Sequence, residues 1–474
     1  MRTTANRMRV LVGYLGMIVL AVAAYLAIRA YGTELVAGHP AVSADGAAKA
    51  PATEMLAQVL VSLAAITLAA RGLGRLFQRY LGQPPVIGEI LAGLALGPSL
   101  LGALSPELQQ HIMPVTAAPF VGMIAKVGVV LFMFLVGLEL DLALARKSSH
   151  ATLVISHASI LAPFLLGATL SLALYPLYAT QDVSFTVFSL FCGVSMSVTA
   201  FPVLARILTD RRVQRTRLGA LALACAAVDD ASAWTLLAFV AGVAGAQASG
   251  VGWTILLSAV FVAAMFGIAG PLLGRLADRE ERSEAPLSQG VLAVVFVALL
   301  LSAAATEFIG IHALFGSFLL GAVMRHDGRL AEQLRARMED IVVVLFLPAF
   351  FAFTGMRTEV GLLHTTTDWL MCGAIVGVAT IGKFGGSFVA ARLVGLGWRE
   401  SSALGILMNT RGLMELIVLN LGLEMGVISP TLFAMLVLMA LITTFTTTPV
   451  LNLIMGERGF ADAPEPEPAR ARKA

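Results

Sequence analysis

The chain has 474 residues, of which 58% are hydrophobic and only 13% are charged, and its formal net charge is +3. A soluble domain normally carries about 25% charged residues, so the composition excludes an ordinary soluble protein and indicates an all-α polytopic membrane protein. We expect a lipid bilayer around it and no nucleic-acid partner. The three cysteines have no metal-ligand or paired spacing and are interpreted as buried small hydrophobic residues: Cys192, Cys225 and Cys372.

Fourteen apolar stretches are predicted to span the bilayer, which takes about 20 residues of helix. The first has the basic start of a signal sequence, but its apolar part of about 19 residues exceeds the usual length. We therefore predict an uncleaved extra helix followed by thirteen core helices. The predicted spans are 10–29, 55–79, 84–103, 118–141, 150–176, 184–208, 216–243, 251–274, 288–306, 308–324, 340–356, 369–394, 401–425 and 430–454.

Three parts of the chain follow from these spans. Residues 1–54 are predicted to contain the extra helix and an external linker, and residues 55–456 form the membrane domain. The tail 457–474 combines prolines with charges and is predicted to be disordered and cytoplasmic. This division leaves no room for a soluble nucleotide-binding domain.

The basic residues determine the predicted orientation, because cytoplasmic connections of membrane proteins are enriched in Lys and Arg. With a cytoplasmic N-terminus, 26 of the 32 basic residues fall on the cytoplasmic side and only Arg29, Lys49 and Arg357 fall outside. The remaining three lie within spans: Lys126, Lys383 and Arg411. We therefore predict that both termini are cytoplasmic and that the protein lies in the plasma (inner) membrane.

Two predicted spans are interrupted near their middle. Span 184–208 is interrupted at Thr199, Ala200, Phe201 and Pro202. Span 401–425 is interrupted at Asn409, Thr410, Arg411 and Gly412. Proline removes a backbone donor and disfavours helix at the residue before it. The two spans run in opposite directions in the predicted topology, which is typical of inverted repeats whose broken helices cross near the bilayer midplane. A simple proline kink and an unrelated glycine are the alternative.

Two adjacent carboxylates, Asp229 and Asp230, lie about halfway along span 216–243. A charge at the bilayer centre costs about 3 kcal/mol or more, so acids at this depth usually mark an ion or proton pathway. Neighbouring side chains diverge by about 100° on a helix. One acid can therefore meet a fixed partner while the other faces a water-filled cavity. A purely structural ion pair is the alternative, although two buried acids are a costly way to fix packing.

Lys383 is the predicted partner of these acids. It lies at a similar depth in span 369–394, and glycines on both sides would let neighbouring helices approach closely. Thr199 and Thr410 would offer hydroxyl groups beside backbone carbonyls that the interruptions set free. The ends of the half-helices carry opposite partial charges, which an acid and a base could neutralise.

The other charged residues within spans have simpler interpretations. Arg411 and Glu415 are spaced i, i+4 and are interpreted as a pair with each other, with a role for Glu415 in the site as the alternative. Glu89 and Glu139 lie near the cytoplasmic ends of their spans, where they either line an entrance or have a packing role. Lys126 is close enough to the outer interface to reach it, and we assign it no function.

Together these parts predict the exchange of a cation for a proton. Burial disfavours the charged form of a carboxylate and a nearby ammonium favours it, so Asp230 is poised to hold either a proton or a small cation. Rocking of one bundle against another would expose this single site to each side in turn. The transported ions would be Na⁺ or K⁺ and H⁺, the site of the monovalent metal ion would be Asp230, and no cofactor is expected.

Six segments carry a family resemblance. They are QPPVIGEILAGLALGPSLLG at 83–102, FLVGLELDL at 134–142, SVTAFPVLARIL at 197–208, AAVDDASAW at 226–234, FLPAFFAFTGMR at 346–357 and LMNTRGLMELIVLN at 407–420. They resemble the monovalent cation:proton antiporter-2 family, and within it the branch of plant cation/proton exchangers and fungal potassium/proton antiporters. The resemblance covers the chain from residue 55 to residue 455 and leaves the first span outside.

The resemblance implies an inverted-repeat sodium/proton antiporter fold, with a core domain, a second domain that forms a homodimer interface, and a role in pH homeostasis. By motif, Asp230 matches the essential ion- and proton-binding acid, Asp229 its variable neighbour and Lys383 the basic residue of the family. An aspartate at position 229 departs from the plant pattern and resembles electrogenic sodium/proton members. The identity of the cation and the stoichiometry therefore stay open at this stage.

Two other functions are alternatives to antiport. A cation channel or ion-gated sensor on the same fold is the first, although a channel favours a continuous polar pore over a paired acid–base site. An intramembrane aspartyl protease is the second, and it needs two acids that share a proton, whereas side chains at i and i+1 diverge. We therefore predict a secondary-active antiporter and not an enzyme.

Overall fold

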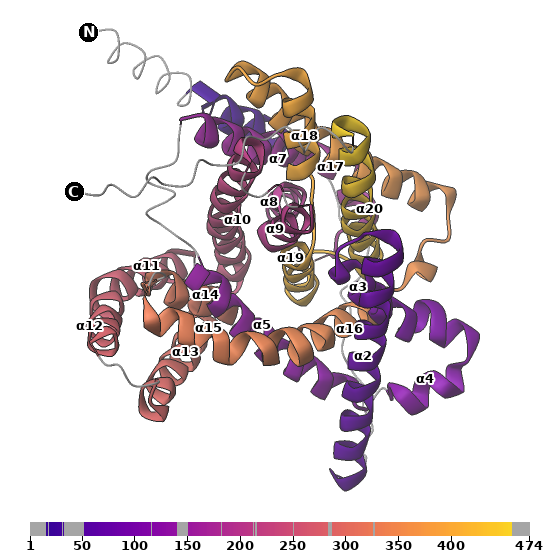
Figure 1. Cartoon of the computed structure of the whole chain (residues 1–474). Coiled ribbons are helices and arrows are strands. Elements are labelled where there is room, and N and C mark those ends of the chain that lie inside the picture. Colours follow the sequence, from indigo (N-terminus) through magenta and orange to yellow (C-terminus); the bar gives the residue numbers. More distant parts are fainter. Residues whose placement is uncertain are drawn as a thin grey trace, which may run out of the picture.

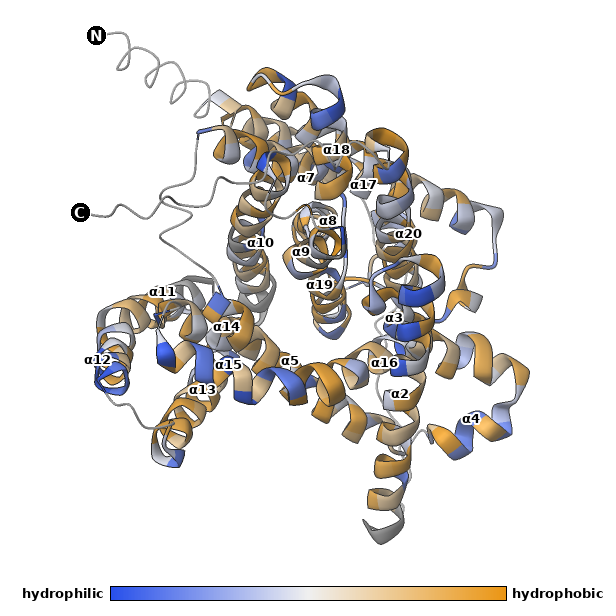
Figure 2. Cartoon of the chain, viewed as in Figure 1, coloured by the Kyte–Doolittle hydropathy of each residue, from blue (hydrophilic) through white to orange (hydrophobic). Residues whose placement is uncertain are grey.

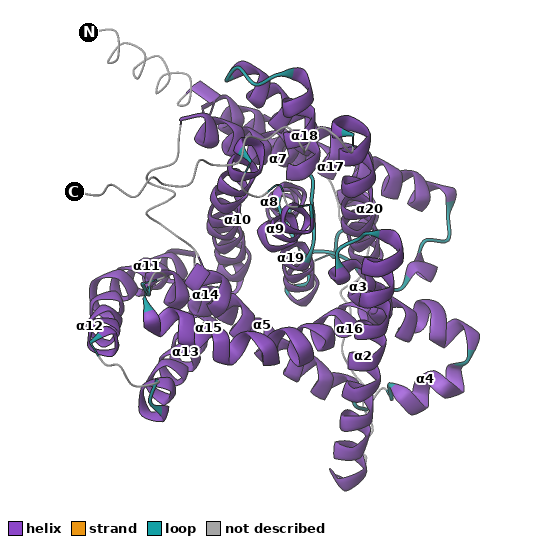
Figure 3. Cartoon of the chain, in the orientation of Figure 1, coloured by secondary structure: helices purple, strands orange, loops and turns teal. Residues whose placement is uncertain are grey.

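The computed structural model describes residues 16–17, 19–30, 32, 52–114, 116–139, 150–181, 183–211, 213, 216–249, 251–282, 287–325 and 328–456. All the regular elements among these residues are helices, as Figure 1 and Figure 3 show. The predicted tail 457–474, most of the predicted external linker and the first residues of span 10–29 lie outside the described residues.

Eleven helices in the described part of the chain are long and apolar enough to cross a membrane, and a bent pair brings the number to twelve. Two further apolar helices, Val19–Ala30 and Ala313–Val323, are shorter than a span. The all-α membrane fold is therefore confirmed. The predicted span 308–324 is not a full one, because the helix within it has only 11 residues.

The helices form two groups. The first, called here the inner bundle, has α8, α9 and α19 at its centre with the other members around them (Figure 1). It consists of α7 (His150–Tyr178), α8 (Phe185–Ser197), α9 (Phe201–Asp210), α10 (Arg217–Ser249), α17 (Thr366–Leu393), α18 (Trp398–Met408), α19 (Leu413–Glu424) and α20 (Pro430–Met455).

The second group, the outer bundle, packs along one side of the first (Figure 1). It consists of α2 (Ala52–Leu81), α3 (Pro85–Leu96), α4 (Pro106–Ile112), α5 (Ala118–Glu139), α11 (Val251–Ala264), α12 (Gly270–Glu281), α13 (Gln289–Ile309), α14 (Ala313–Val323), α15 (Arg329–Ile341) and α16 (Leu347–Arg357). The short turns η1 (Pro98–Gly102), η2 (Met265–Ala269) and η3 (Val342–Phe346) continue α3, α11 and α15, and η4 (Val360–Leu362) follows α16.

Burial differs sharply between the two bundles. In the most apolar stretch of span 185–209, 89% of the residues are buried inside the protein, against 11% in span 256–281. Large apolar side chains of the outer bundle are exposed, among them Leu68, Val260 and Leu301, and Figure 2 shows hydrophobic residues along its helices. Apolar surface of this extent is what a bilayer covers. The centre of the inner bundle is therefore the part best shielded from lipid and water.

One span starts earlier than its sequence predicts. The sequence predicts 340–356, whereas α15, η3 and α16 run together from Arg329 to Arg357. The added part is rich in charge, so apolar content does not detect it. It is nevertheless an amphipathic helix, because Leu330 and Leu334 are buried while most of its charged side chains are not.

Candidate functional site

Two helices are interrupted at the centre of the inner bundle. α8 ends at Ser197 and α9 begins at Phe201, so Pro202 lies in the first turn of α9. A proline is tolerated there because the first amides of a helix have no intrahelical acceptor. The second interruption separates α18, which ends at Met408, from α19, which begins at Leu413, with a bend of 43°.

The two breaks contact each other directly. The amide of Ala200 donates a hydrogen bond to the carbonyl of Thr410 (3.0 Å). The Thr199 hydroxyl lies 3.2 Å from the Met408 carbonyl, and the Thr410 hydroxyl donates to the Leu407 carbonyl (2.7 Å). The Thr410 hydroxyl thus satisfies a carbonyl at the C-terminal end of α18, where the helix itself provides no partner. The inverted-repeat relation between the two interrupted helices stays a prediction.

The C-terminal end of α8 is held by two buried cations. Arg411 donates hydrogen bonds to the carbonyls of Ser195 (2.8 Å) and Met196 (2.5 Å). Lys383 donates to the carbonyl of Ser197 (2.5 Å). The last carbonyls of a helix lack internal partners and carry a partial negative charge. The two cations therefore supply both the missing hydrogen bonds and the opposite charge.

Lys383 reaches this position because α17 packs closely against α7. A Cβ atom on Gly382 would lie 2.6 Å from the Cα of Pro163, and one on Gly386 would lie 2.6 Å from the carbonyl oxygen of Ala158. Larger residues would force the two helices apart at these positions. The predicted close approach at the glycines around Lys383 is therefore present.

The Asp229 carboxylate is surrounded by donors. Lys383 Nζ lies 2.9 Å from its Oδ2, and the Thr199 hydroxyl lies 2.8 Å from the same oxygen. Two serines of α7 complete the set: Ser156 donates to Oδ1 (2.5 Å) and Ser159 donates to Oδ2 (2.6 Å). The structure thus brings Asp229 and Lys383 together and adds hydroxyl groups that the sequence did not indicate.

Asp230 has far fewer contacts than its neighbour. It is only 5% exposed, and its Oδ1 has no hydrogen-bond partner in the part of the chain that the structure describes. The amide of Phe201 lies within hydrogen-bonding reach of its carboxylate, at the helix end whose partial positive charge favours an anion. Asp230 lines a cavity of about 10 Å³. This volume is roughly the minimum for one water molecule.

A second buried ion pair lies at the break between α18 and α19. Arg411 Nη1 is 2.9 Å from Oε2 of Glu415, and the Ser195 hydroxyl donates to Oε1 (2.9 Å). Thr444 of α20 binds both backbone groups of Arg411: its hydroxyl accepts from the amide (2.9 Å) and donates to the carbonyl (2.7 Å). Neighbouring helices therefore fix this break in place.

Two other predicted site residues lie in the same break. Asn409 is fully buried, and neither polar atom of its side chain has a hydrogen-bond partner among the described residues. Gly412 lies against α9, where an added Cβ would be 2.5 Å from the side chain of Val203. Buried polar atoms are normally paired, so the Asn409 amide is available to an ion or a water molecule.

The buried charges of the inner bundle do not balance. In its described residues they are Asp229, Asp230, Lys383, Arg411 and Glu415. Each base pairs with one acid, and Asp230 is the acid left over. With every group ionised the cluster would carry one net negative charge, which is unfavourable in a buried position. One proton or one monovalent cation at Asp230 would neutralise it.

A cavity of about 450 Å³ approaches the breaks from one end of the molecule. Its walls include Pro202 of α9 and Leu413 of α19. Glu89 lies in it 3.6 Å from an arginine of α2, and Glu139 lies in it 3.4 Å from an arginine of α15. Both acids therefore line a cavity. That this cavity is an entrance for ions stays a prediction. Its charged residues are Arg71, Arg75, Glu89, Glu139, Arg335 and Glu339.

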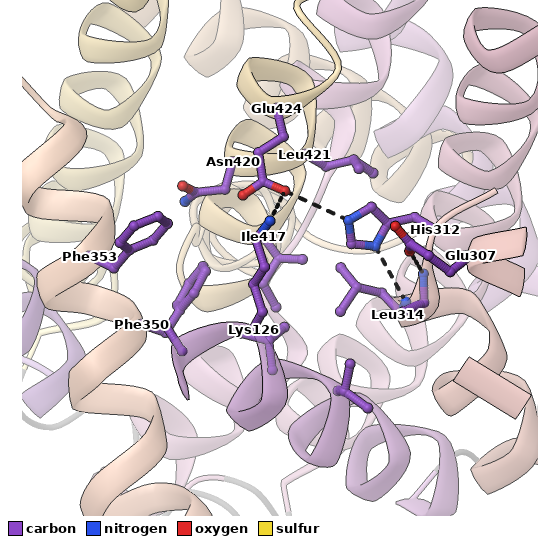
Figure 4. Close-up of a pocket in the computed structure, with 14 residues that line it drawn as sticks. Lys126, Glu307, His312, Leu314, Phe350, Phe353, Ile417, Asn420, Leu421 and Glu424 are labelled. Carbon is purple, nitrogen blue, oxygen red and sulfur yellow. Dashed lines mark hydrogen bonds and ion pairs between the residues drawn. The ribbon is translucent and has the colours of Figure 1, made fainter. Parts of the chain in front are cut away.

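A second cavity, of about 170 Å³, lies toward the opposite ends of α5 and α19 (Figure 4). At its rim lies Glu424, the last residue of α19, and basic side chains of the outer bundle surround its carboxylate. Lys126 lies 2.9 Å, Arg357 3.1 Å and the His312 ring 3.8 Å from its carboxylate. Among the described residues, His312 alone combines a positive φ (75°) with a side chain larger than that of glycine, a strained conformation. This cluster joins the two bundles at this end.

Several of these contacts were missed from the sequence. Hydroxyl groups are common in apolar spans, so nothing in the sequence distinguishes Thr444 of α20. The sole signal for Ser156 and Ser159 is that they are spaced i, i+3 on α7. Glu424 could have been found, because a carboxylate inside the predicted span 401–425 is unfavourable unless it is paired. Lys126 was assigned no function, yet it is the closest of the basic side chains around Glu424.

Comparisons with known proteins agree with this arrangement. Residues 68–453 match the protein family described as "Sodium/hydrogen exchanger, transmembrane". The chain is 44% identical over 400 residues to the Na⁺/H⁺ antiporter NhaS4 of Synechocystis sp., with 84% of this chain and 97% of the relative covered. It is 39% identical over 407 residues to cation/H⁺ antiporter 20 of Arabidopsis thaliana, covering 84% of this chain and 48% of the relative.

The fungal relative and the solved structures extend the comparison. The chain is 37% identical over 383 residues to K⁺/H⁺ antiporter 1 of Saccharomyces cerevisiae, covering 78% of this chain and 43% of the relative. It thus spans about half the length of the plant and yeast proteins. The sodium proton antiporter MjNhaP1 of Methanocaldococcus jannaschii is 15% identical, with a TM-score of 0.57 over 86% of this chain and 99% of that one. The predicted antiporter fold is therefore confirmed.

Proposed function

The chain belongs to the family of transmembrane sodium/hydrogen exchangers, and we propose that it is a secondary-active antiporter that exchanges Na⁺ or K⁺ for H⁺. The observation that carries the proposal is Asp230, the buried acid of the described inner bundle that no base pairs with. Sodium and potassium both occur in the names of its relatives, and either is a single positive charge of the kind that this acid lacks.

Cation and proton would compete for Asp230. Its Oδ1 has no partner among the described residues, and Asp230 lines a space of about 10 Å³, so there is room for one small ion or one water molecule and no more. Either a proton or a monovalent cation cancels the surplus charge of the buried cluster. Both together would create a surplus of the opposite sign, which is unfavourable for the same reason. Occupancy by one therefore excludes the other, and this exclusion couples the two fluxes.

In an alternating-access cycle, each of the two cavities would connect the ion site to one side of the membrane. The larger one ends at Pro202 and Leu413, beside the breaks. The smaller one is bounded by later residues of α19 and by the Glu424 cluster. Opening this side would require Glu424 to leave Lys126 and Arg357, because these pairs tie the inner bundle to the outer one.

We propose that the larger cavity opens to the cytoplasm. Its rim carries Arg71, Arg75 and Arg335, and basic residues are enriched on the cytoplasmic side of membrane proteins. Glu89 and Glu139 would attract cations into it. Both termini would then be cytoplasmic, in the plasma (inner) membrane. We further propose a homodimer formed through the outer bundle, where large apolar side chains are exposed.

Purified protein in liposomes that contain a pH-sensitive dye tests the proposal. With the same pH inside and outside, external Na⁺ or K⁺ should raise the internal pH by driving protons out against the gradient that develops, whereas external choline should not. Li⁺ as a third cation would rank the ions by size. A cation channel or ion-gated sensor would instead pass a cation current without moving protons against their gradient, and that result would contradict antiport.

A further inference from the structure

We propose that Trp234 closes the ion site toward the cavity of about 170 Å³, called here the smaller cavity, and that its contact with Phe315 and Phe318 breaks whenever the site opens to that side. This inference rests on the proposed function and names the side chain that acts as its barrier. Trp234 belongs to α10 of the inner bundle, whereas both phenylalanines belong to α14 of the outer bundle. The contact therefore joins the two parts that an alternating-access cycle would move relative to each other.

The space beside Asp230 has a wall without oxygen atoms. Asp230 and Trp234 are four residues apart on α10, so their side chains lie on the same face of the helix. The space has a volume of about 10 Å³, so it holds at most one water molecule. Apart from Asp230, the residues that line it have no side-chain oxygen: Val198, Ala233, Trp234, Leu237, Met414 and Val418. A hydrated cation therefore cannot pass unless these side chains move.

About one turn of helix separates this space from the smaller cavity. On α19, Met414 and Val418 line the space beside Asp230, while Ile417 and Leu421 line the smaller cavity. Val418 and Leu421 are three residues apart, which is a rise of about 4.5 Å along the helix. The barrier between the two spaces is therefore thin, and a single layer of side chains can form it.

The ring of Trp234 lies at this boundary. On α14, Leu314 lines the smaller cavity, and the next residue, Phe315, contacts Trp234. The Trp234 ring meets Phe315 edge to face, with the centroids 6.0 Å apart, and it stacks on Phe318 with the centroids 5.8 Å apart. Aromatic pairs in these geometries are favourable beyond the area that they bury. The three rings thus form the layer that separates the two spaces.

The two phenylalanines are held in place by the outer bundle. A Cβ atom on Gly316 would lie 2.1 Å from the carbonyl oxygen of Ser302 on α13, and one on Gly321 would lie 2.2 Å from the carbonyl oxygen of Phe134 on α5. Such close approach leaves α14 no room to follow a movement of the inner bundle. When the bundles move, Trp234 therefore slides over α14 and leaves its ring contacts.

Cysteine labelling on the two sides of the ring measures the barrier. Val418→Cys places a thiol in the space beside Asp230, and Leu421→Cys places one in the smaller cavity. The rate of reaction with a small charged methanethiosulfonate reagent is recorded in detergent solution. Because the ring contacts must open first, we expect Val418→Cys to react about tenfold more slowly than Leu421→Cys. The chain without an added cysteine gives the background, since its own cysteines are buried: Cys192, Cys225 and Cys372.

Variants of the rings identify the side chain that forms the barrier. In Trp234→Ala, Val418→Cys should react about tenfold faster, while the rate of Leu421→Cys stays within about twofold. Trp234→Phe keeps an aromatic ring against α14 and should keep the slow rate. Phe318→Ala removes the partner ring and gives the same test if Trp234→Ala does not fold. Trp253→Ala is the matched control, because Trp253 of α11 is 62% exposed and should affect neither rate.

The outcomes are distinct. Equal rates for Val418→Cys and Leu421→Cys in the otherwise wild-type protein would show that no barrier separates the two spaces, and the inference would be wrong. An unchanged slow rate of Val418→Cys in both Trp234→Ala and Phe318→Ala would exclude the rings as the barrier. Labelling does not depend on transport. If the expected rates were found in a protein without cation-driven proton flux in liposomes, the barrier would stand and the proposed function would fail.

Discussion

The inner bundle contains two breaks in its helices, one between α8 and α9 and one between α18 and α19. The two breaks differ in how the buried charges beside them are paired. The break between α8 and α9 has no ionisable residue of its own and is approached by Asp229, Asp230 and Lys383 from α10 and α17. The break between α18 and α19 contains Arg411, which pairs with Glu415. One acid is left unpaired at the first break and none at the second. We infer that the first break is where ions are exchanged and that the second is a fixed support.

The largest effect is expected from removing the unpaired charge at the first break. Asp230→Asn keeps the shape of the side chain but cannot take up a proton and binds a cation poorly, so exchange should fall to the level of protein-free liposomes. Folding should survive, because the change removes a buried charge and adds none. Proton flux in liposomes and elution as a single species in detergent measure the two properties.

A matched control separates this effect from a general loss of charge. Asp278→Asn removes an exposed carboxylate that pairs with Arg325 on the outer bundle, and we expect wild-type exchange from it. Transport retained in Asp230→Asn would show that the unpaired acid does not carry the ion. The inference that ions are exchanged at the first break would then be wrong.

The next effect concerns stability at the second break. Arg411→Met leaves Glu415 as a buried acid without its base and frees the carbonyls of Ser195 and Met196. Removal of one member of a buried pair destabilises a protein by about 3–5 kcal/mol. We expect a loss of this size in denaturant-induced unfolding. Arg411→Met/Glu415→Met should recover part of it, since no unpaired acid remains. Equal unfolding of wild type and Arg411→Met would show that this pair is not a support.

A smaller effect is expected from the side chain that holds the same break from α20. Thr444→Val keeps the volume of the residue but leaves the amide and the carbonyl of Arg411 without their partner. Unsatisfied buried groups of this kind are worth about 1–3 kcal/mol. Thr446→Val is the control, because the Thr446 hydroxyl donates to the Thr443 carbonyl of its own helix and does not contact Arg411. If both variants unfolded alike, the contact with Arg411 would carry no particular weight.

The parts of the site that could be predicted are those that depart from an apolar pattern. Asp229, Asp230 and Lys383 are charges in the middle of spans, and Pro202 removes a backbone donor within an apolar stretch. Such departures are visible in one stretch of sequence. The same reasoning placed most of the membrane helices, because apolar length alone identifies them.

The rest depends on partners distant in the chain. Ser156 meets Asp229 across 73 residues and Thr444 meets Arg411 across 33, and a serine or threonine in a helix gives no sign of such a partner. The sequence also gives no size for the space beside Asp230, because its volume depends on how α8, α10 and α19 pack. Composition does not determine that packing.

The smallest effect is expected where α19 leaves the fixed support and meets the outer bundle. Glu424→Gln weakens its pairs with Lys126 and Arg357, and partly exposed pairs are worth about 1 kcal/mol or less each. Together the two pairs are worth about 2 kcal/mol or less, so we expect a change of less than about thirtyfold in the conformational equilibrium. Labelling of Leu421→Cys by a membrane-impermeant maleimide should become faster in the Glu424→Gln background, since that cavity opens more often. Arg325→Gln, which breaks an exposed pair elsewhere, should leave labelling unchanged. Equal labelling in all three would mean that the end of α19 is as fixed as its beginning.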